Sequence, residues 1–85
     1  PEMVLDVLWF AWLRERVGEG RERVETEAAT VAALVEELRL RSPAHALALS
    51  DLRSVRAALD RRLVAMDAPL GQAREVAFFP PMTGG

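Results

Sequence analysis

The last two residues of the printed sequence, Gly84 and Gly85, are the ones best suited to carry chemistry. Neither has a side chain, so their backbone can pass through a narrow channel and present a terminal carboxylate to an attacking or activating group. Bulk at either position is expected to block this entry. The pair therefore predicts a tail on which a partner protein acts, and a chain that serves as a carrier rather than as a stand-alone enzyme.

Pro80 and Pro81 direct this tail. They remove two backbone donors and hold the chain in a stiff, extended direction, so that residues 80–85 reach at most about 20 Å. The whole tail, Met82 and Thr83 included, is expected to enter a partner's pocket. A frayed end without function is the alternative interpretation, because glycine is common at disordered termini.

The residue types that are missing exclude several kinds of site. The chain has no cysteine and one histidine, His45. It therefore has no thiolate nucleophile, no cysteine-based zinc site, no cluster of histidine ligands and no support for a catalytic triad. We expect His45 to be an ordinary surface residue and the chain to bind no metal or cofactor of its own. Any sulfur that the protein handles must come from another molecule.

The charges argue against two further classes of function. All eleven basic residues are arginine, and they are interspersed with thirteen acidic residues to give a net charge of −2. Without a basic stripe, nucleic-acid binding has little electrostatic support. Without lysine, the chain has no side-chain amine for Schiff-base chemistry or for an isopeptide bond. The sequence also lacks a leader-like start and a run of about 18 apolar residues, so we expect no membrane insertion and a cytoplasmic location.

Two strands are expected in the first third of the chain. Residues 4–10 alternate between two largely apolar faces, which suits a central strand covered by a helix on one side. Gly18 and Gly20 bracket a turn. Residues 21–28 then alternate charged and smaller side chains, as in a strand that is hairpinned onto the first and lies nearer an edge.

The middle of the chain predicts one main helix and one short helix. Thr30 is a good N-cap, and apolar residues from Val31 to Leu38 follow at the spacing of one helical face. Pro43 ends or resets this helix. Residues 44–49 are rich in alanine and leucine and predict the short second helix.

The remainder predicts three strands that complete a single domain. Residues 55–59 and 63–66 flank a charged turn, residues 67–71 supply turn chemistry, and residues 75–79 form the last strand before the prolines. The element order is β-β-α-(α)-β-β-β. We expect one α+β domain over residues 1–85, a mixed sheet with a helix packed across it.

An apolar surface is expected beside the tail if the first and last strands are neighbours. Contiguous exposed apolar surface usually marks an interaction site, with aromatic residues as its energetic anchors. The residues concerned are Leu8, Phe10, Ala77 and Phe79. Arg14 can receive a partner's carboxylate nearby. The alternatives are that a loop or the short second helix covers this face and that Arg14 is an ordinary surface arginine.

Several segments together resemble a known family. The similarity covers essentially the whole chain and is most specific in the tail. The sequence is similar to the small subunits of molybdopterin synthase, the MoaD family of ubiquitin-like sulfur carriers. The segments that carry the resemblance are residues 7–11, 13–15, 17–18, 30–31, 67–70 and 75–85.

The resemblance implies a ubiquitin-like β-grasp fold and a carrier cycle. An E1-like adenylyltransferase would adenylate the Gly85 carboxylate with ATP and Mg²⁺, and a sulfur donor, either a sulfurtransferase or a cysteine desulfurase, would convert it to a thiocarboxylate. In the family, the tail inserts into the large subunit, which uses the sulfur to convert cyclic pyranopterin monophosphate into molybdopterin. Two carriers serve one large-subunit dimer, which makes a heterotetramer.

Family roles carry over by position. Phe10 and Phe79 match the hydrophobic contact with the large subunit, Arg14 matches a polar contact beside it, and Gly84 and Gly85 match the active tail. The carrier itself would have no catalytic side chain.

The sequence departs from the family at two places. Trp12 stands where the family often has a polar residue, and residues 60–62 form a charged turn. These departures bear on the fit to partners and leave the tail unchanged. Two other readings stay open at this point: a related carrier for thiamine, cysteine or tRNA thiolation, or a protein modifier, with the same tail; and a non-covalent interaction module with an inert tail.

Overall fold

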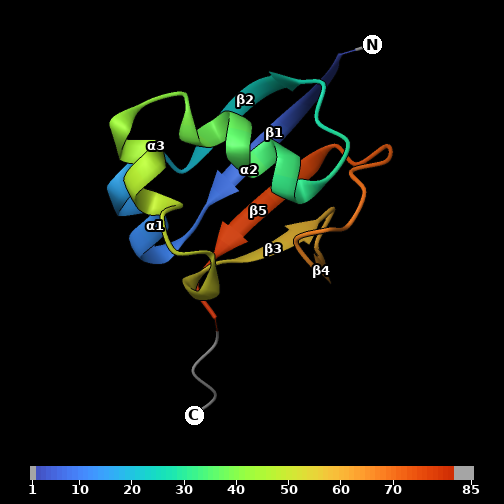
Figure 1. The fold of residues 1–85 in the computed structure, drawn as a ribbon. Helices are drawn as coiled ribbons and strands as arrows, with labels where there is room; N and C mark the ends of the chain where they lie inside the picture. Colours follow the sequence, from blue (N-terminus) through green and yellow to red (C-terminus); the bar gives the residue numbers. More distant parts are fainter. Residues whose placement is uncertain (1, 82–85) are drawn as a thin grey trace.

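The computed structural model describes residues 2–81 of the chain, which form a mixed five-stranded sheet in the order β2-β1-β5-β3-β4. Strands β1 and β5 run parallel at the centre, and every other pair is antiparallel (Figure 1). The strands are β1 (Met3–Trp9), β2 (Arg21–Thr26), β3 (Arg56–Leu59), β4 (Arg62–Val64) and β5 (Glu75–Phe79).

Alternation along the two central strands produces the core. In β1, Leu5, Val7 and Trp9 are fully buried on one face, and in β5 Val76 and Phe78 are buried on the same side. This confirms the predicted central strand and the predicted last strand. Strand β2 lies at an edge, also as predicted.

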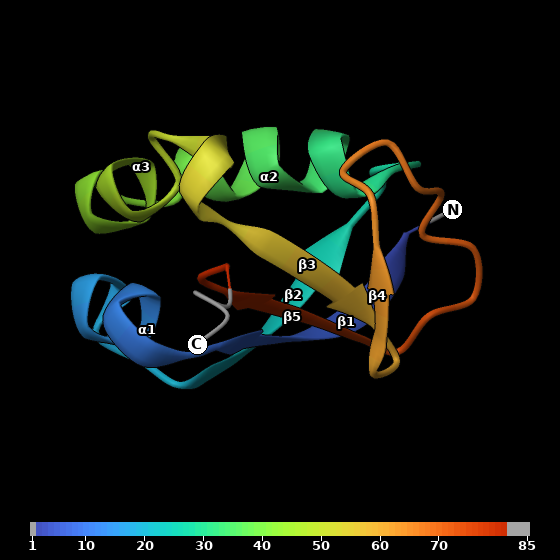
Figure 2. The same cartoon turned by 90° about the horizontal axis from the view of Figure 1, so that it is seen from below.

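Two helices cover the buried face of the sheet, as the middle of the sequence predicts. Helix α2 (Val31–Arg39) begins at Thr30, whose side chain accepts a hydrogen bond from the backbone N–H of Ala33 at 3.1 Å. Helix α3 (Pro43–Ala48) begins in the same way at Ser42. Figure 2 shows α2 and α3 above the strands, and none of the described helices covers the opposite face. A 3-10 turn, η1 (Leu52–Ser54), leads from α3 into β3.

A third helix was not predicted. The segment between β1 and β2, expected to be a simple turn, contains helix α1 (Ala11–Val17) at the end of the sheet (Figure 2). Gly18 ends it in the left-handed region, at φ 93°, where a residue without a Cβ is favoured. The segment has only seven residues and buries only Leu13 fully, so it lacks the long apolar periodicity by which helices are recognised in sequence.

The predicted hairpin between β3 and β4 is confirmed. Its two turn residues, Asp60 and Arg61, have φ values of 47° and 72°. The Asp60 side chain accepts hydrogen bonds from the backbone N–H groups of Arg74 and Glu75, at 3.0 and 3.1 Å. These bonds tie the hairpin to the start of β5.

One hydrophobic core joins the sheet to the helices. The four buried residues of α2 lie at the spacing predicted for one helical face. They are Val31, Leu34, Val35 and Leu38. Within residues 2–81, no helix has the length and apolar character needed to cross a membrane.

Candidate functional site: the open sheet face and the root of the tail

The uncovered face of the sheet carries an apolar row that runs across four strands. Leu8 in β1 is in register with Ala77 in β5, Ala77 with Ala58 in β3, and Ala58 with Leu63 in β4. Side chains in register on neighbouring strands point to the same side of a sheet. The row, together with Phe10 and Phe79 at its tail end, is called the open face below.

The open face is the apolar surface that the sequence predicts, and it extends further than expected. Strands β1 and β5 are neighbours, as required. Phe10 is 48% exposed, and Leu8 and Phe79 are partly exposed, whereas Ala77 and Ala58 are buried at 9% and 8%. Sequence reasoning missed Leu63, which is 70% exposed. The signal was present in the β3–β4 hairpin, because its register fixes the side on which Leu63 lies.

Phe10 is held at the point where β1 becomes α1. Its backbone N–H donates to the Phe78 carbonyl at 3.1 Å, and its own carbonyl accepts from the N–H of Leu13 at 3.1 Å. The next residue, Ala11, has a φ of 54°, which is unusual for a residue with a Cβ. This sharp change of direction leaves the Phe10 side chain projecting at the edge of the open face.

Arg14 lies one helical turn beyond Phe10 and is exposed. Its side chain passes over Gly20, so that a Cβ added at Gly20 would come within 3.1 Å of the Arg14 guanidinium carbon. A residue without a side chain at position 20 thus leaves room for the arginine. Arg14 is available for the polar contact expected of it.

A charged group borders the open face at the edge strand β2. Asp6 accepts hydrogen bonds from Arg21 at 2.7 Å and from Arg23 at 3.4 Å. The hydrogen bond from Arg21 is the main cause that holds the pKa of the Asp6 carboxyl below its ordinary value. This acid is therefore already paired with two arginines of β2.

The tail leaves the domain beside a groove of about 600 Å³ between α1, α3 and η1. Pro80 and Pro81 lie along this groove, and directly follow the central strand β5. The remaining residues predicted to form the site, Met82, Thr83, Gly84 and Gly85, lie outside the described residues. The structure therefore places the root of the tail, between the open face and the groove.

The prediction for His45 was wrong, because this residue is buried. Its Nε2 donates to the Glu22 carboxylate at 2.8 Å, and its Nδ1 is 2.7 Å from the Ser42 hydroxyl. Trp9 Nε1 donates to the same carboxylate at 2.7 Å. Ser42 is a local partner, but Glu22 and Trp9 come from β2 and β1, far away in the sequence, so the pattern around His45 gave no sign of the burial.

Burial would raise the pKa of the Glu22 carboxyl, but its partners outweigh that effect. The hydrogen bonds from His45 and Trp9, with the charges of His45 and Arg41, hold this pKa below its ordinary value. The group joins β2 to α3. It is a structural connection, and it lies on the face away from the open face.

A parallel β1–β5 pair, helices on one face and a tail that leaves the central strand define a ubiquitin-like β-grasp protein. The chain belongs to the ThiS family, whose profile matches residues 7–85. It is 44% identical, over 96% of its length and 100% of the relative's, to the molybdopterin synthase sulfur carrier subunit of Escherichia coli K12. The corresponding subunit of Haemophilus influenzae is 35% identical over the same shares of both chains.

A solved structure confirms the predicted fold. SAMP1 from Haloferax volcanii superposes with a TM-score of 0.73, covers 98% of this chain and 100% of its own, and is 25% identical in sequence. The predicted β-grasp fold and the predicted family resemblance are thus both confirmed.

Proposed function

We propose that this protein is the sulfur carrier subunit of a molybdopterin synthase. The observation that carries the proposal is the match at 44% identity to a subunit of that name, which runs along the full length of the relative. The family match extends over residues 84 and 85, the positions of the glycine pair. In this proposal the Gly85 carboxylate is the reactive group.

The chemistry requires two steps at that carboxylate. A carboxylate is a poor electrophile until it carries a leaving group. A carboxylate oxygen attacks the α-phosphorus of ATP, held with Mg²⁺ on an E1-like adenylyltransferase, and pyrophosphate leaves. The outer sulfur of a persulfide on a sulfurtransferase or a cysteine desulfurase then displaces AMP at the carbonyl carbon to give an acyl disulfide. A thiol attacks the donor's sulfur of this disulfide, which releases the thiocarboxylate and leaves a disulfide between the thiol and the donor. The carrier supplies no catalytic side chain and no cofactor to either step.

The large subunit of the synthase is the partner proposed for the open face. Phe10 and Phe79 provide exposed aromatic area there, and Arg14 lies next to them for a carboxylate of the partner. The tail then enters the large subunit, where its sulfur is used to convert cyclic pyranopterin monophosphate into molybdopterin. Two carriers on a large-subunit dimer give the proposed heterotetramer. Its cytoplasmic location stays a prediction.

The test is the intact mass of the chain after incubation with ATP, Mg²⁺, its E1-like enzyme and a sulfur donor. We expect a gain equal to the exchange of one oxygen for one sulfur, localised to Gly85 by fragmentation. The matched control is a chain without Gly85, which should keep its fold by circular dichroism and gain no mass.

The outcomes separate the readings. An unchanged mass, with the enzyme shown to be active on another carrier, would contradict the proposal and favour a non-covalent module. Sulfur exchange without molybdopterin formation on addition of the large subunit and its substrate would point to a related carrier. Covalent conjugates to other proteins in cell extracts would indicate a modifier.

A further inference from the structure

Trp12, one of the two places at which the sequence departs from the resembled family, forms part of a groove that the proposed function does not use. The groove runs between α1 and α3. It lies on one side of the root of the tail, and the open face lies on the other side. Its lining is partly apolar, with Trp12 half-buried and Leu47 58% exposed. We call this the tail-root groove: Trp12, Arg16, Leu47, Ala48, Ser50, Asp51, Ser54, Pro80 and Pro81.

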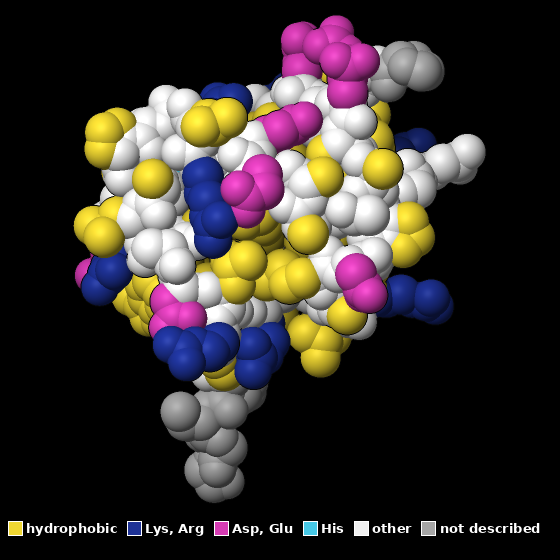
Figure 3. Space-filling view, in the orientation of Figure 1, with side chains coloured by type: hydrophobic (Ala, Val, Ile, Leu, Met, Phe, Trp, Pro, Cys, Tyr) yellow, Lys and Arg dark blue, Asp and Glu magenta, His cyan; other side chains and the backbone are white. Residues whose placement is uncertain are grey.

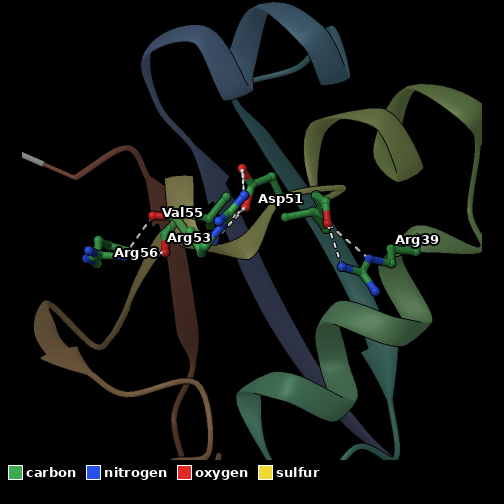
Figure 4. A network of polar contacts seen from close by, with 6 residues as sticks. Arg39, Asp51, Arg53, Val55 and Arg56 are labelled. Carbon is green, nitrogen blue, oxygen red and sulfur yellow. Dashed lines mark hydrogen bonds and ion pairs between the residues drawn. The ribbon is translucent and has the colours of Figure 1, made fainter.

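The α3 wall of the tail-root groove is held by polar contacts to neighbouring elements. The Arg39 guanidinium donates twice to the Leu49 carbonyl just after α3, at 3.0 and 2.7 Å (Figure 4). The His45–Glu22 hydrogen bond holds the same helix to β2. Below it, Asp51 caps η1 by accepting from the Arg53 N–H at 3.1 Å. A surface held in this way is preorganised for a partner.

The charge of the tail-root groove is asymmetric. Arg16 lies over the Trp12 ring, with its guanidinium carbon 5.0 Å from the ring centroid, and makes no ion pair within residues 2–81. Asp51, the one acid of the lining, is paired with Arg53 at 3.1 Å. In Figure 3, apolar side chains stand out over α3, and basic side chains gather at the lower end of the molecule. The surface therefore suits an apolar side chain beside a carboxylate.

The short distance between the tail-root groove and Gly85 limits which partner can contact both. Gly85 lies four residues after Pro81, and this segment spans at most about 14 Å. In the proposed function, the large subunit holds Gly85 and covers Phe10 and Phe79. Both aromatic residues are close in sequence to the groove: Trp12 lies two residues after Phe10, and Pro80 directly follows Phe79. A partner that encloses this tail within such a short reach meets both sides of its root.

We propose that the tail-root groove is a second docking surface for the large subunit and receives one of its apolar side chains, with a neighbouring carboxylate placed against Arg16. The inference rests on the proposed function. Trp12 enlarges the apolar part of this surface, so the groove selects the large subunit that matches this carrier.

The test compares two leucine variants, Leu47→Ser in the groove and Leu40→Ser as a matched control. Leu40 is 87% exposed and lies just after α2, outside the groove. The dissociation constant for the large subunit from the same organism is measured by calorimetry. We expect L47S to raise it about 5- to 30-fold and L40S to change it by less than about twofold.

A charge pair of variants tests the second element. Arg16→Glu should weaken binding more at low salt than at high salt, whereas Arg74→Glu, the same change at an exposed site outside the groove, should have a smaller effect. Circular dichroism checks that each variant is folded.

The outcomes distinguish this inference from the function on which it rests. Binding of L47S equal to that of the wild type overturns the groove and leaves the proposed function intact. A loss of adenylation in L47S with unchanged large-subunit binding also overturns it, because the groove then serves the activating enzyme. Failure of the wild-type chain to bind the large subunit overturns both.

Discussion

The two faces of strand β5 differ in what they contribute, although their residues alternate along one short segment. Phe78 is fully buried and stacks on Trp9 with ring centroids 5.1 Å apart, whereas its neighbour Phe79 is partly exposed on the open face. The covered face provides the free energy of folding and the open face is left for a partner. Because side chains alternate between the two faces of a strand, neighbouring residues of β5 serve stability on one face and recognition on the other.

The largest expected effect comes from breaking the covered face. Phe78→Ala should lower the free energy of unfolding by about 3–5 kcal/mol, because it removes a fully buried aromatic ring and leaves a cavity. Phe79→Ala should cost less than about 1 kcal/mol and instead weaken large-subunit binding at least about tenfold. Urea unfolding and calorimetry measure the two effects. Equal destabilisation by both variants would contradict the division between the faces.

Removing the charge of Glu22, which lies on the covered face, should have the next largest effect. Glu22→Gln removes the charge that His45, Trp9 and Arg41 surround, and should lower the free energy of unfolding by about 1–3 kcal/mol at pH 7. The pKa of Glu22 is lowered on folding, so this stabilisation is present above the unfolded-state pKa near 4.5 and is lost as the pH falls through the folded-state value.

Chemical denaturation from pH 7 to pH 3 checks this. The difference between wild type and E22Q should shrink below about pH 4.5. Glu25→Gln, an exposed site on the same strand, is the control and should show little difference at any pH. A constant E22Q effect across the range would show that the charge of Glu22 is not what joins β2 to α3.

The smallest expected effect comes from the turn after β1, where Ala11 has a φ of 54°. Ala11→Gly should raise the free energy of unfolding by about 0.5–1 kcal/mol, because glycine adopts this conformation without the steric cost of a Cβ. Ala33→Gly in α2 is the same change at an exposed helical position and should lower it by a similar amount. Destabilisation by both substitutions would mean that the turn is not strained.

Much of this architecture could be predicted from local sequence. Fewer than ten neighbouring residues are enough to predict each of three features: the cap at Thr30, the apolar face of α2, and the alternation in β1 and β5. Helix α1 could not be predicted with equal ease, because it is short and begins at an alanine in an unusual conformation. The Phe10 and Phe79 surface followed from a single assumption about strand order, which the sheet confirms.

What the sequence by itself determined is the family, the alternating strands, the helix caps and a tail whose prolines end the last strand. Only the tertiary structure decided the burial of His45 on Glu22, the alignment of Leu63 with Leu8 across four strands, and the groove between α1 and α3. The physical reason is the distance along the sequence over which each interaction acts. Periodicity and capping act within a few residues, whereas a buried hydrogen bond between distant residues, a sheet register and a groove exist only once distant segments have packed together.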